Sequence, residues 1–216
     1  ESEKKNTHLE HLEDEVFNGG IPGTRRAINF LRGLRDMLLG HSSASVNVTV
    51  KWDGAPAVVC GINPENGKFF VATKSAFNKQ PKLNYTHDDI LKNHSGSSGL
   101  IDKLRVCLDN LPKLGIKGVL QGDLLFTKGE LQSITHDGEP LVAFRANTIT
   151  YAVPADSELA SKLAAANLGI VFHTTYTGNK IETMKASFGA NVGSLSRTPS
   201  VWVTSADFRD ESGSAT

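Results

Sequence analysis

Residues 46–54 alternate between apolar and polar side chains with a period of two. This alternation is typical of a half-buried β-strand, so the segment is predicted to form one. Lys51 lies on the polar side of the predicted strand, and Asp53-Gly54 follows where the chain is expected to turn. The segment is therefore expected to hold a lysine on a polar surface next to a tight turn.

Two hairpins are predicted further along the chain, because apolar segments there flank residues that favour turns. Residues 57–62 and 68–74 flank Asn63-Pro64-Glu65-Asn66-Gly67, and residues 131–135 and 141–153 flank His136-Asp137-Gly138-Glu139. Additional strands are predicted over residues 118–126, 148–153, 168–174 and 200–204. Hairpins favour antiparallel pairing, so the expected fold class is α+β, with two twisted, mainly antiparallel sheets around a cleft and helices outside.

The first 40 residues have apolar side chains at helical spacing and are predicted to be helical. Gly19-Gly20 is expected to break this segment into two helices. Thr24 is the predicted N-cap of the second helix, and Gly40 is predicted to end it as the C′ residue.

Two later helices are predicted from the same spacing. One runs from Ile101 to Leu111 and ends at Pro112, and Asp156 is expected to cap the other. The second is expected to bury one side, which consists of Leu159, Leu163 and Ala164. Residues 76–99 are polar and lack apolar periodicity, so they are predicted to form a long mobile loop at the rim of the cleft.

Composition narrows the class of protein. The 216 residues include 23 basic and 23 acidic side chains, so the formal net charge is zero, which argues against strong non-specific binding to nucleic acid. No run of 18 apolar residues and no apolar leader segment occurs, so no membrane partner is expected. Cys60 and Cys107 lie in apolar segments and are predicted to be buried, reduced thiols, which favours a cytoplasmic location.

Lys51-Trp52-Asp53-Gly54 carries the candidate chemistry. The sequence Lys-x-Asp-Gly resembles the nucleophile motif of the covalent nucleotidyltransferases, the superfamily of ATP-dependent DNA ligases, RNA ligases and mRNA capping enzymes. The resemblance implies that Lys51 attacks the α-phosphate of a nucleoside triphosphate and carries the nucleotide as a phosphoramidate, with ATP and Mg²⁺ as cofactors. A strand that ends in an exposed lysine and an Asp-Gly turn is the alternative without chemistry.

The order of later segments is also similar to that superfamily. Lys74-Ser75 ends a strand after the lysine motif, and Gly122-Asp123 interrupts an apolar strand, where a carboxylate needs a partner or a use. The resemblance implies nucleotide contacts from Asp53, Gly54, Lys74 and Asp123. It further implies that Asp123 contacts the ribose or a metal ion, and that Tyr151 stacks on the base, with Phe144 as the second candidate.

The last two motifs of the superfamily, Glu/Asp-Gly-apolar and Lys-apolar-Lys, do not occur in the chain. The predicted organisation is a helical segment over residues 1–40, a nucleotidyltransferase-like core over residues 41–178, and an extension over residues 179–216 that continues in a longer protein. The motif order also resembles ligase-like proteins of tailed phages, which would place the protein in the host cytoplasm.

Three functional hypotheses follow from this resemblance. The first is a ligase-like adenylyltransferase that acts on RNA or DNA ends. The second is a non-catalytic protein of the same fold that binds nucleotide or nucleic acid, and the third is a structural phage component. An AMP adduct on Lys51 is expected for the complete protein, with weak or no labelling of residues 1–216 alone.

Overall fold

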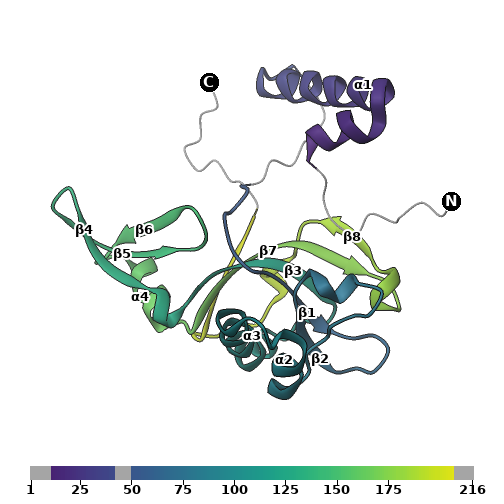
Figure 1. Cartoon of the computed structure of the whole chain (residues 1–216). Coiled ribbons are helices and arrows are strands. Elements are labelled where there is room, and N and C mark those ends of the chain that lie inside the picture. The colour runs from purple at the N-terminus through teal and green to yellow at the C-terminus, as the bar shows by residue number, and fades with distance from the viewer. Residues whose placement is uncertain (1–10, 42–49, 207–216) are drawn as a thin grey trace. The chain divides into compact units, whose positions relative to one another are not determined.

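The computed structural model describes residues 11–41 and 50–206 (Figure 1). The chain divides into two units, one that extends to Val50 and one from Lys51 to Ala206, and each is described by itself. The described residues form a mixed α+β protein with four α-helices and two sheets. None of the described helices is long and apolar enough to cross a membrane.

Helix α1 spans Leu12–Leu38 and is kinked at Gly20, whose φ of 53° and ψ of −140° are not helical. This position confirms the predicted break. The predicted N-cap at Thr24 is wrong, because its hydroxyl donates to the Gly20 carbonyl at 2.9 Å from inside the helix. Pro22 lies inside the helix ahead of Thr24. Proline favours the first turn of a helix, so the second part begins earlier than predicted.

Gly40 ends α1 as predicted. Its φ is 71°, which is the left-handed conformation that glycine adopts without strain. The Gly40 amide donates to the Met37 carbonyl at 2.9 Å, and the His41 amide donates to the Asp36 carbonyl at 2.8 Å. These two bonds form the Schellman arrangement, which satisfies the last carbonyl groups of the helix.

A six-stranded sheet forms the body of the second unit. Its strands follow the order β2-β1-β3-β7-β8, and β9 pairs with β7. All pairs are antiparallel except β7 with β9. The strands are β1 (Ala57–Ile62), β2 (Phe69–Ala72), β3 (Val119–Thr127), β7 (Leu168–Thr177), β8 (Lys185–Phe188) and β9 (Val201–Ser205).

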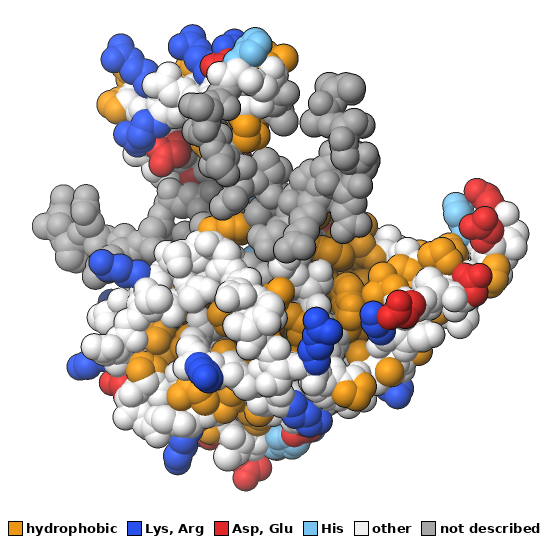
Figure 2. Space-filling view, turned by 180° about the vertical axis from the view of Figure 1, so that it is seen from behind, with side chains coloured by type: hydrophobic (Ala, Val, Ile, Leu, Met, Phe, Trp, Pro, Cys, Tyr) orange, Lys and Arg blue, Asp and Glu red, His pale blue; other side chains and the backbone are white. Residues whose placement is uncertain are grey.

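A three-stranded antiparallel sheet consists of β4 (Gln132–His136), β5 (Glu139–Arg145) and β6 (Thr150–Pro154). Both predicted hairpins are therefore confirmed, with β1 paired to β2 and β4 paired to β5. Asp137 and Gly138 both have positive φ angles, 50° and 83°, which is what a two-residue hairpin turn requires. Seen from behind, this hairpin carries acidic and histidine side chains at its tip, and apolar side chains gather beside its base (Figure 2).

Helices α2 (His87–His94) and α3 (Ser98–Asn110) lie on one side of the six-stranded sheet, and α4 (Glu158–Ala165) follows β6 (Figure 1). The main core lies between α3 and the sheet, where Leu104, Leu124 and Phe172 are fully buried. Cys60 and Cys107 are buried in the same core as free thiols, as predicted. Short 3₁₀ turns occur at η1 (Lys74–Phe77), η2 (Leu111–Leu114), η3 (Lys128–Glu130), η4 (Ile181–Thr183) and η5 (Val192–Ser194).

The predicted strand at the lysine motif is wrong for the residues that the structure describes. Residues 50–56 form no strand and β1 begins at Ala57, while residues 46–49 lie outside the described part of the chain. The Asp53 carboxylate binds a turn far away in the sequence, which holds the start of this segment through a side chain. Alternation alone does not reveal such a contact.

The predicted long loop over residues 76–99 is also wrong, because it contains η1 and α2. Thr86 caps α2 by accepting from the Asp89 amide at 3.1 Å, and the Asp89 carboxylate accepts from the Thr86 amide at 2.9 Å. This reciprocal capping box is a strong start signal for a helix. Asn84 is fully buried and pairs through its backbone with Val71.

The N-cap of α4 (Glu158–Ala165) lies one residue later than the predicted cap at Asp156. Ser157 is the N-cap, and its hydroxyl accepts from the Ala160 amide at 3.1 Å. The buried side of the helix consists of Ala160 and Leu163, whereas Leu159 and Ala164 are exposed. The predicted buried side was therefore correct only for Leu163.

We expect Thr86→Ala to lower the free energy of unfolding by about 1 kcal/mol, because it removes the side-chain cap of α2. Ser97→Ala is the matched control, since Ser97 is the N-cap residue of α3 but makes no side-chain cap bond. Urea denaturation of both variants measures the difference. Equal losses in the two variants would contradict a stabilising role for the capping box.

Candidate functional site

The segment that follows Lys51 lies along strand β3. The Ala55 amide donates to the Leu124 carbonyl at 3.0 Å, and the Leu124 amide donates to the Pro56 carbonyl at 3.1 Å. The same pairing continues into β1, where Ala57 lies opposite Asp123. Lys51 itself is exposed. The backbone that follows it is fixed to the central sheet through the bonds of Ala55 and Pro56.

Gly54 packs directly against Asp123. A Cβ atom at Gly54 would lie 2.6 Å from the Asp123 Cβ atom and 2.9 Å from the Leu124 carbonyl oxygen, which is closer than real contacts allow. Only glycine permits this approach. The structure therefore brings together two of the residues that the sequence predicts for the site, although they are far apart in the chain.

Asp53 binds the turn between β5 and β6. Its Oδ2 atom accepts from the Thr148 amide at 2.6 Å and from the Ile149 amide at 2.7 Å, and its Oδ1 atom accepts from the Asn147 side chain at 3.1 Å. The hydrogen bond from Ile149 contributes most to lowering the pKa of Asp53, and the nearby Lys51 ammonium contributes to the same direction. The Asp53 carboxylate therefore joins the lysine segment to the three-stranded sheet.

Tyr151 lies in an aromatic cluster beside this turn. Its hydroxyl accepts from the Asp53 amide at 2.9 Å. Its ring lies 5.0 Å from the Trp52 ring and 5.5 Å from the Phe144 ring, measured between centroids. Trp52 also contacts Trp202 edge to face at 6.4 Å. Both residues predicted to stack on a base therefore pack against protein rings, and base stacking by either stays a prediction.

Asp123 lies on the face of the six-stranded sheet opposite α3. Leu124, the next residue, belongs to the core beneath α3, and successive side chains of a strand point to opposite faces. The side chain of Asp123 is 22% exposed, and its Oδ2 atom lies 3.6 Å from the Nε2 atom of His173 on β7. The sequence analysis did not single out His173, because its position beside Asp123 depends on strand pairing that includes a register shift at Gln121/Gly122.

Lys74 lies apart from Asp123 in the sheet. It is exposed in η1, directly after β2, and β1 separates β2 from β3. The preceding Thr73 hydroxyl accepts from the Ser75 amide at 3.3 Å, which orders this turn. Among the described residues, no hydrogen bond or ion pair joins Lys74 to the lysine segment, so its role at a phosphate stays a prediction.

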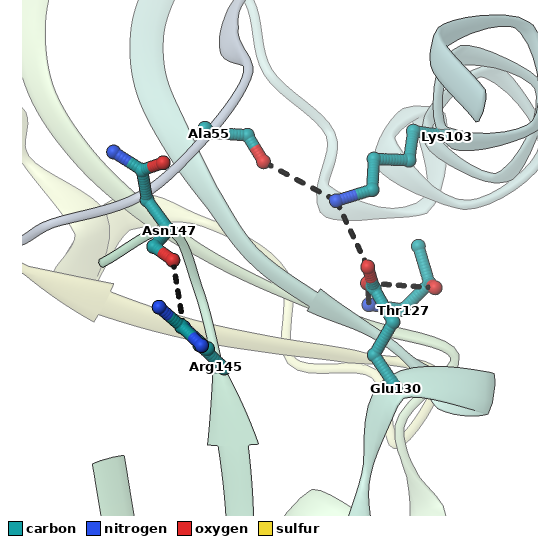
Figure 3. A network of polar contacts seen from close by, with 6 residues as sticks. All are labelled: Ala55, Lys103, Thr127, Glu130, Arg145 and Asn147. Atoms are coloured by element: carbon teal, nitrogen blue, oxygen red, sulfur yellow. Dashed lines mark hydrogen bonds and ion pairs between the residues drawn. The ribbon is translucent and has the colours of Figure 1, made fainter. Parts of the chain in front are cut away.

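A second polar network holds the lysine segment from the side of α3 (Figure 3). The Lys103 ammonium lies 2.9 Å from the Glu130 Oε1 atom and donates to the Ala55 carbonyl at 3.4 Å. The Glu130 Oε2 atom accepts from the amide and the hydroxyl of Thr127 at 2.7 and 3.0 Å. Partial burial raises the pKa of Glu130, but the bonds from Lys103 and Thr127 outweigh it, so the net shift is downward.

The sequence analysis missed this network, although one signal for it exists. Thr127-Lys128-Gly129-Glu130 has the Thr-x-x-Glu spacing of a capping box, and the structure shows both reciprocal bonds. The ion pair to Lys103 has no such local signal, because it joins α3 to the turn after β3. Figure 3 also shows the Arg145 side chain beside the turn that Asp53 binds, with its Nε atom donating to the Asn147 carbonyl at 3.2 Å.

The donor set around Asp123 bears on the predicted Mg²⁺. Within residues 11–41 and 50–206, no three His, Cys, Asp or Glu side chains gather as a potential metal site. Mg²⁺ commonly uses one or two carboxylates and completes its shell with water and substrate phosphates. A single half-buried carboxylate at Asp123 fits that requirement if a triphosphate supplies the other ligands.

A pocket lies elsewhere in the second unit. It has a volume of about 820 Å³ and is lined by α4, by residues 192–199 and by Val201, Trp202 and Val203 of β9. Lys51, Asp53, Gly54 and Asp123 do not line it. The candidate site is therefore separate from this pocket.

Comparison with known proteins identifies the family but no relative of known function. The chain belongs to DUF6267, a family of unknown function, whose sequence pattern matches residues 6–216. No curated protein and no solved structure matches the chain.

We expect Asp53 to titrate below its ordinary value of 3.8, because three hydrogen bonds and Lys51 favour its carboxylate form. Its contribution to stability is thus complete above about pH 4 and is lost as the pH falls through the lowered pKa of the folded protein. The amide NMR shifts of Thr148 and Ile149 should report this titration.

The Asp53→Asn variant should lose this titration at both amides. Asp102→Asn should leave the titration at both amides unchanged, because Asp102 is a separate carboxylate on α3 that is 75% exposed. A midpoint at or above pH 3.8 for these amides in the unaltered protein would contradict the assignment.

Proposed function

We propose that this chain carries the core of an ATP-dependent, ligase-like adenylyltransferase in which Lys51 is the nucleophile. The observation that supports this most is the packing of Gly54 on Asp123, because it joins the Lys-x-Asp-Gly segment to the acidic strand residue. In the proposed reading, the six-stranded and three-stranded sheets form the nucleotidyltransferase fold, with the nucleotide near Asp123.

The fixed backbone around Lys51 also supports the proposal. A nucleophile gains rate when its approach to the reacting atom is set in advance. Asp53 is bound to the turn at residues 147–149, and Ala55 is bound to β3. Lys51 is exposed, so its side chain has access to a ligand from solvent.

The proposed reaction is a transfer of AMP to the Lys51 amine. Neutral Nζ attacks the α-phosphorus of ATP, so that a P–N bond forms and the P–O bond to pyrophosphate breaks. The amine loses a proton to solvent during the transfer, since Lys51 is exposed, and pyrophosphate carries away the bonding electron pair. Phosphoryl-type transfer depends mainly on position and charge stabilisation, which is what a held loop and a nearby carboxylate for a cation can provide.

Asp123 would hold Mg²⁺ through its carboxylate in this proposal. The metal ion would neutralise the charge of the triphosphate and favour the departure of pyrophosphate. Gly54 would serve the nucleotide site by letting the lysine segment pack closely against Asp123, where the nucleotide is proposed to lie. The proposed acceptors of the AMP are the ends of RNA or DNA, as in the ligases that the motif order resembles.

We expect incubation with ATP labelled at the α-phosphate and Mg²⁺ to place AMP on Lys51, identified by peptide mapping, with at most a small labelled fraction when residues 1–216 are incubated alone. Lys51→Ala should abolish the label, whereas Lys68→Ala, an exposed lysine beside β2, should retain it. A small labelled fraction is sufficient, because the experiment reads the attachment site. An adduct on another residue, or an undiminished label in Lys51→Ala, would remove Lys51 from the mechanism.

A non-catalytic nucleotide-binding protein is the second candidate. It is favoured because both Asp53 and Tyr151 bind other parts of the protein. The Asp53 carboxylate accepts from the β5–β6 turn, and the Tyr151 hydroxyl accepts from the Asp53 amide, so these groups are not free for a ligand. Saturable ATP binding without any adduct on Lys51 would favour this candidate over the enzyme.

A further inference from the structure

The Lys103–Glu130 ion pair is not explained by the proposed chemistry or by the core. Lys103 is 27% exposed and Glu130 is 36% exposed, so the pair lies partly within the protein. Fully exposed ion pairs on protein surfaces are common and contribute little to stability. This pair differs because each partner has a further contact: Lys103 binds the Ala55 carbonyl of the lysine segment, and Glu130 binds Thr127 at the end of β3.

Glu130 is fixed independently of Lys103. Its second carboxylate oxygen accepts two bonds from Thr127, the last residue of β3, and these bonds set the carboxylate against the end of the central strand. Lys103 comes from α3, whose apolar side packs on the same sheet. The ammonium is therefore placed by a helix and a carboxylate that are both anchored on the central sheet.

The other contact of Lys103 is the Ala55 carbonyl. This residue directly follows Gly54, and its amide is bound to Leu124 of β3. The bond from the Lys103 ammonium to the Ala55 carbonyl is long, at 3.4 Å, whereas the contact of the ammonium with Glu130 is 2.9 Å. The position of the ammonium is therefore set mainly by Glu130. Ala55 is held through its amide by β3. Its carbonyl is held by Lys103 of α3, as Figure 3 shows.

We propose that the Lys103–Glu130 pair is a positioning device for the nucleophile: it fixes the Ala55 carbonyl and thereby the approach of the Lys51–Gly54 segment to Asp123. The catalytic part of this inference rests on the proposed function of Lys51. The mechanical part concerns the free protein and does not need a nucleotide. Lys103 is a positioning residue, because its ammonium acts through the Ala55 backbone and Glu130.

Two substitutions test the device while they preserve shape. Lys103→Met retains the apolar stem and removes the charge, and Glu130→Gln is nearly isosteric. The matched control is the pair Lys162→Met and Glu158→Gln on α4, where an ion pair of 2.7 Å is exposed and lies away from the lysine segment. Lys103→Arg keeps the charge and should restore the behaviour of the unaltered protein.

The first measurement is hydrogen exchange in the nucleotide-free protein. The amides of Ala55 and Leu124 should exchange about tenfold faster in Lys103→Met and Glu130→Gln, since the loop then has one anchor fewer. The control pair should leave these amides unchanged. Unchanged exchange in both test variants would overturn the positioning role, whether or not the protein is labelled by ATP.

The second measurement is the rate of AMP transfer to Lys51. Lys103→Met should lower the rate constant about tenfold and change the ATP concentration for half-maximal rate less than twofold, because the device positions the nucleophile without touching ATP. A change in the half-maximal concentration alone would overturn the inference. If the unaltered protein is never labelled, the proposed function fails, and faster exchange at Ala55 would still support the mechanical role.

Discussion

The close contact of Gly54 with Asp123 constrains all the other contacts of the candidate site. With no side chain at Gly54, the backbone reaches the central strand closely enough for Ala55 and Pro56 to bond with Leu124. That register places Ala57 opposite Asp123 and starts β1. A larger residue at Gly54 would have to displace either the Asp123 side chain or the Leu124 carbonyl. Either displacement would disturb the ladder between β1 and β3.

Two carboxylates hold the same segment from different sides, and they do so in different environments. Asp53 accepts from backbone amides at the surface, so its charge is favoured by donors that are already fixed in a turn. Glu130 is partly buried and reaches the segment only through Lys103. The first contact ties the lysine segment to the three-stranded sheet, and the second ties it to α3. Lys51 thus precedes a backbone held by both sheets and by a helix.

Local signals explain what the sequence could predict. The turns at Gly67 and Asp137-Gly138 and the helix end at Gly40 depend on residues next to each other, and all three were predicted correctly. The capping box at Thr86 is equally local and was overlooked, which turned α2 into a supposed loop. The strand at Lys51 failed for a different reason. The alternation shows which side chains are apolar. It does not show that Asp53 binds a turn 94 or more residues away in the sequence.

The candidate site shows the same limit. Lys51, Asp53, Gly54 and Asp123 were found because they belong to short motifs, and the structure brings the last two into contact. His173 and Lys103 belong to no motif of that kind, and Glu130 belongs only to the capping box with Thr127. The relation of all three residues to the site exists only after β3 pairs with β7 and α3 packs on the sheet. Tertiary contacts of this sort are invisible to periodicity and spacing.

The distribution of charge limits how the proposed chemistry can operate. Lys103 is committed to Glu130 and to the Ala55 carbonyl, and Lys74 follows β2, which β1 separates from β3. Of these three lysines, Lys51 alone belongs to the Lys-x-Asp-Gly motif, and within the described residues only Lys103 has a carboxylate within 4 Å. A triphosphate near Asp123 would therefore need its charge balanced mainly by a metal ion. This makes the Asp123 carboxylate, more than any additional lysine, the group on which the proposed reaction depends.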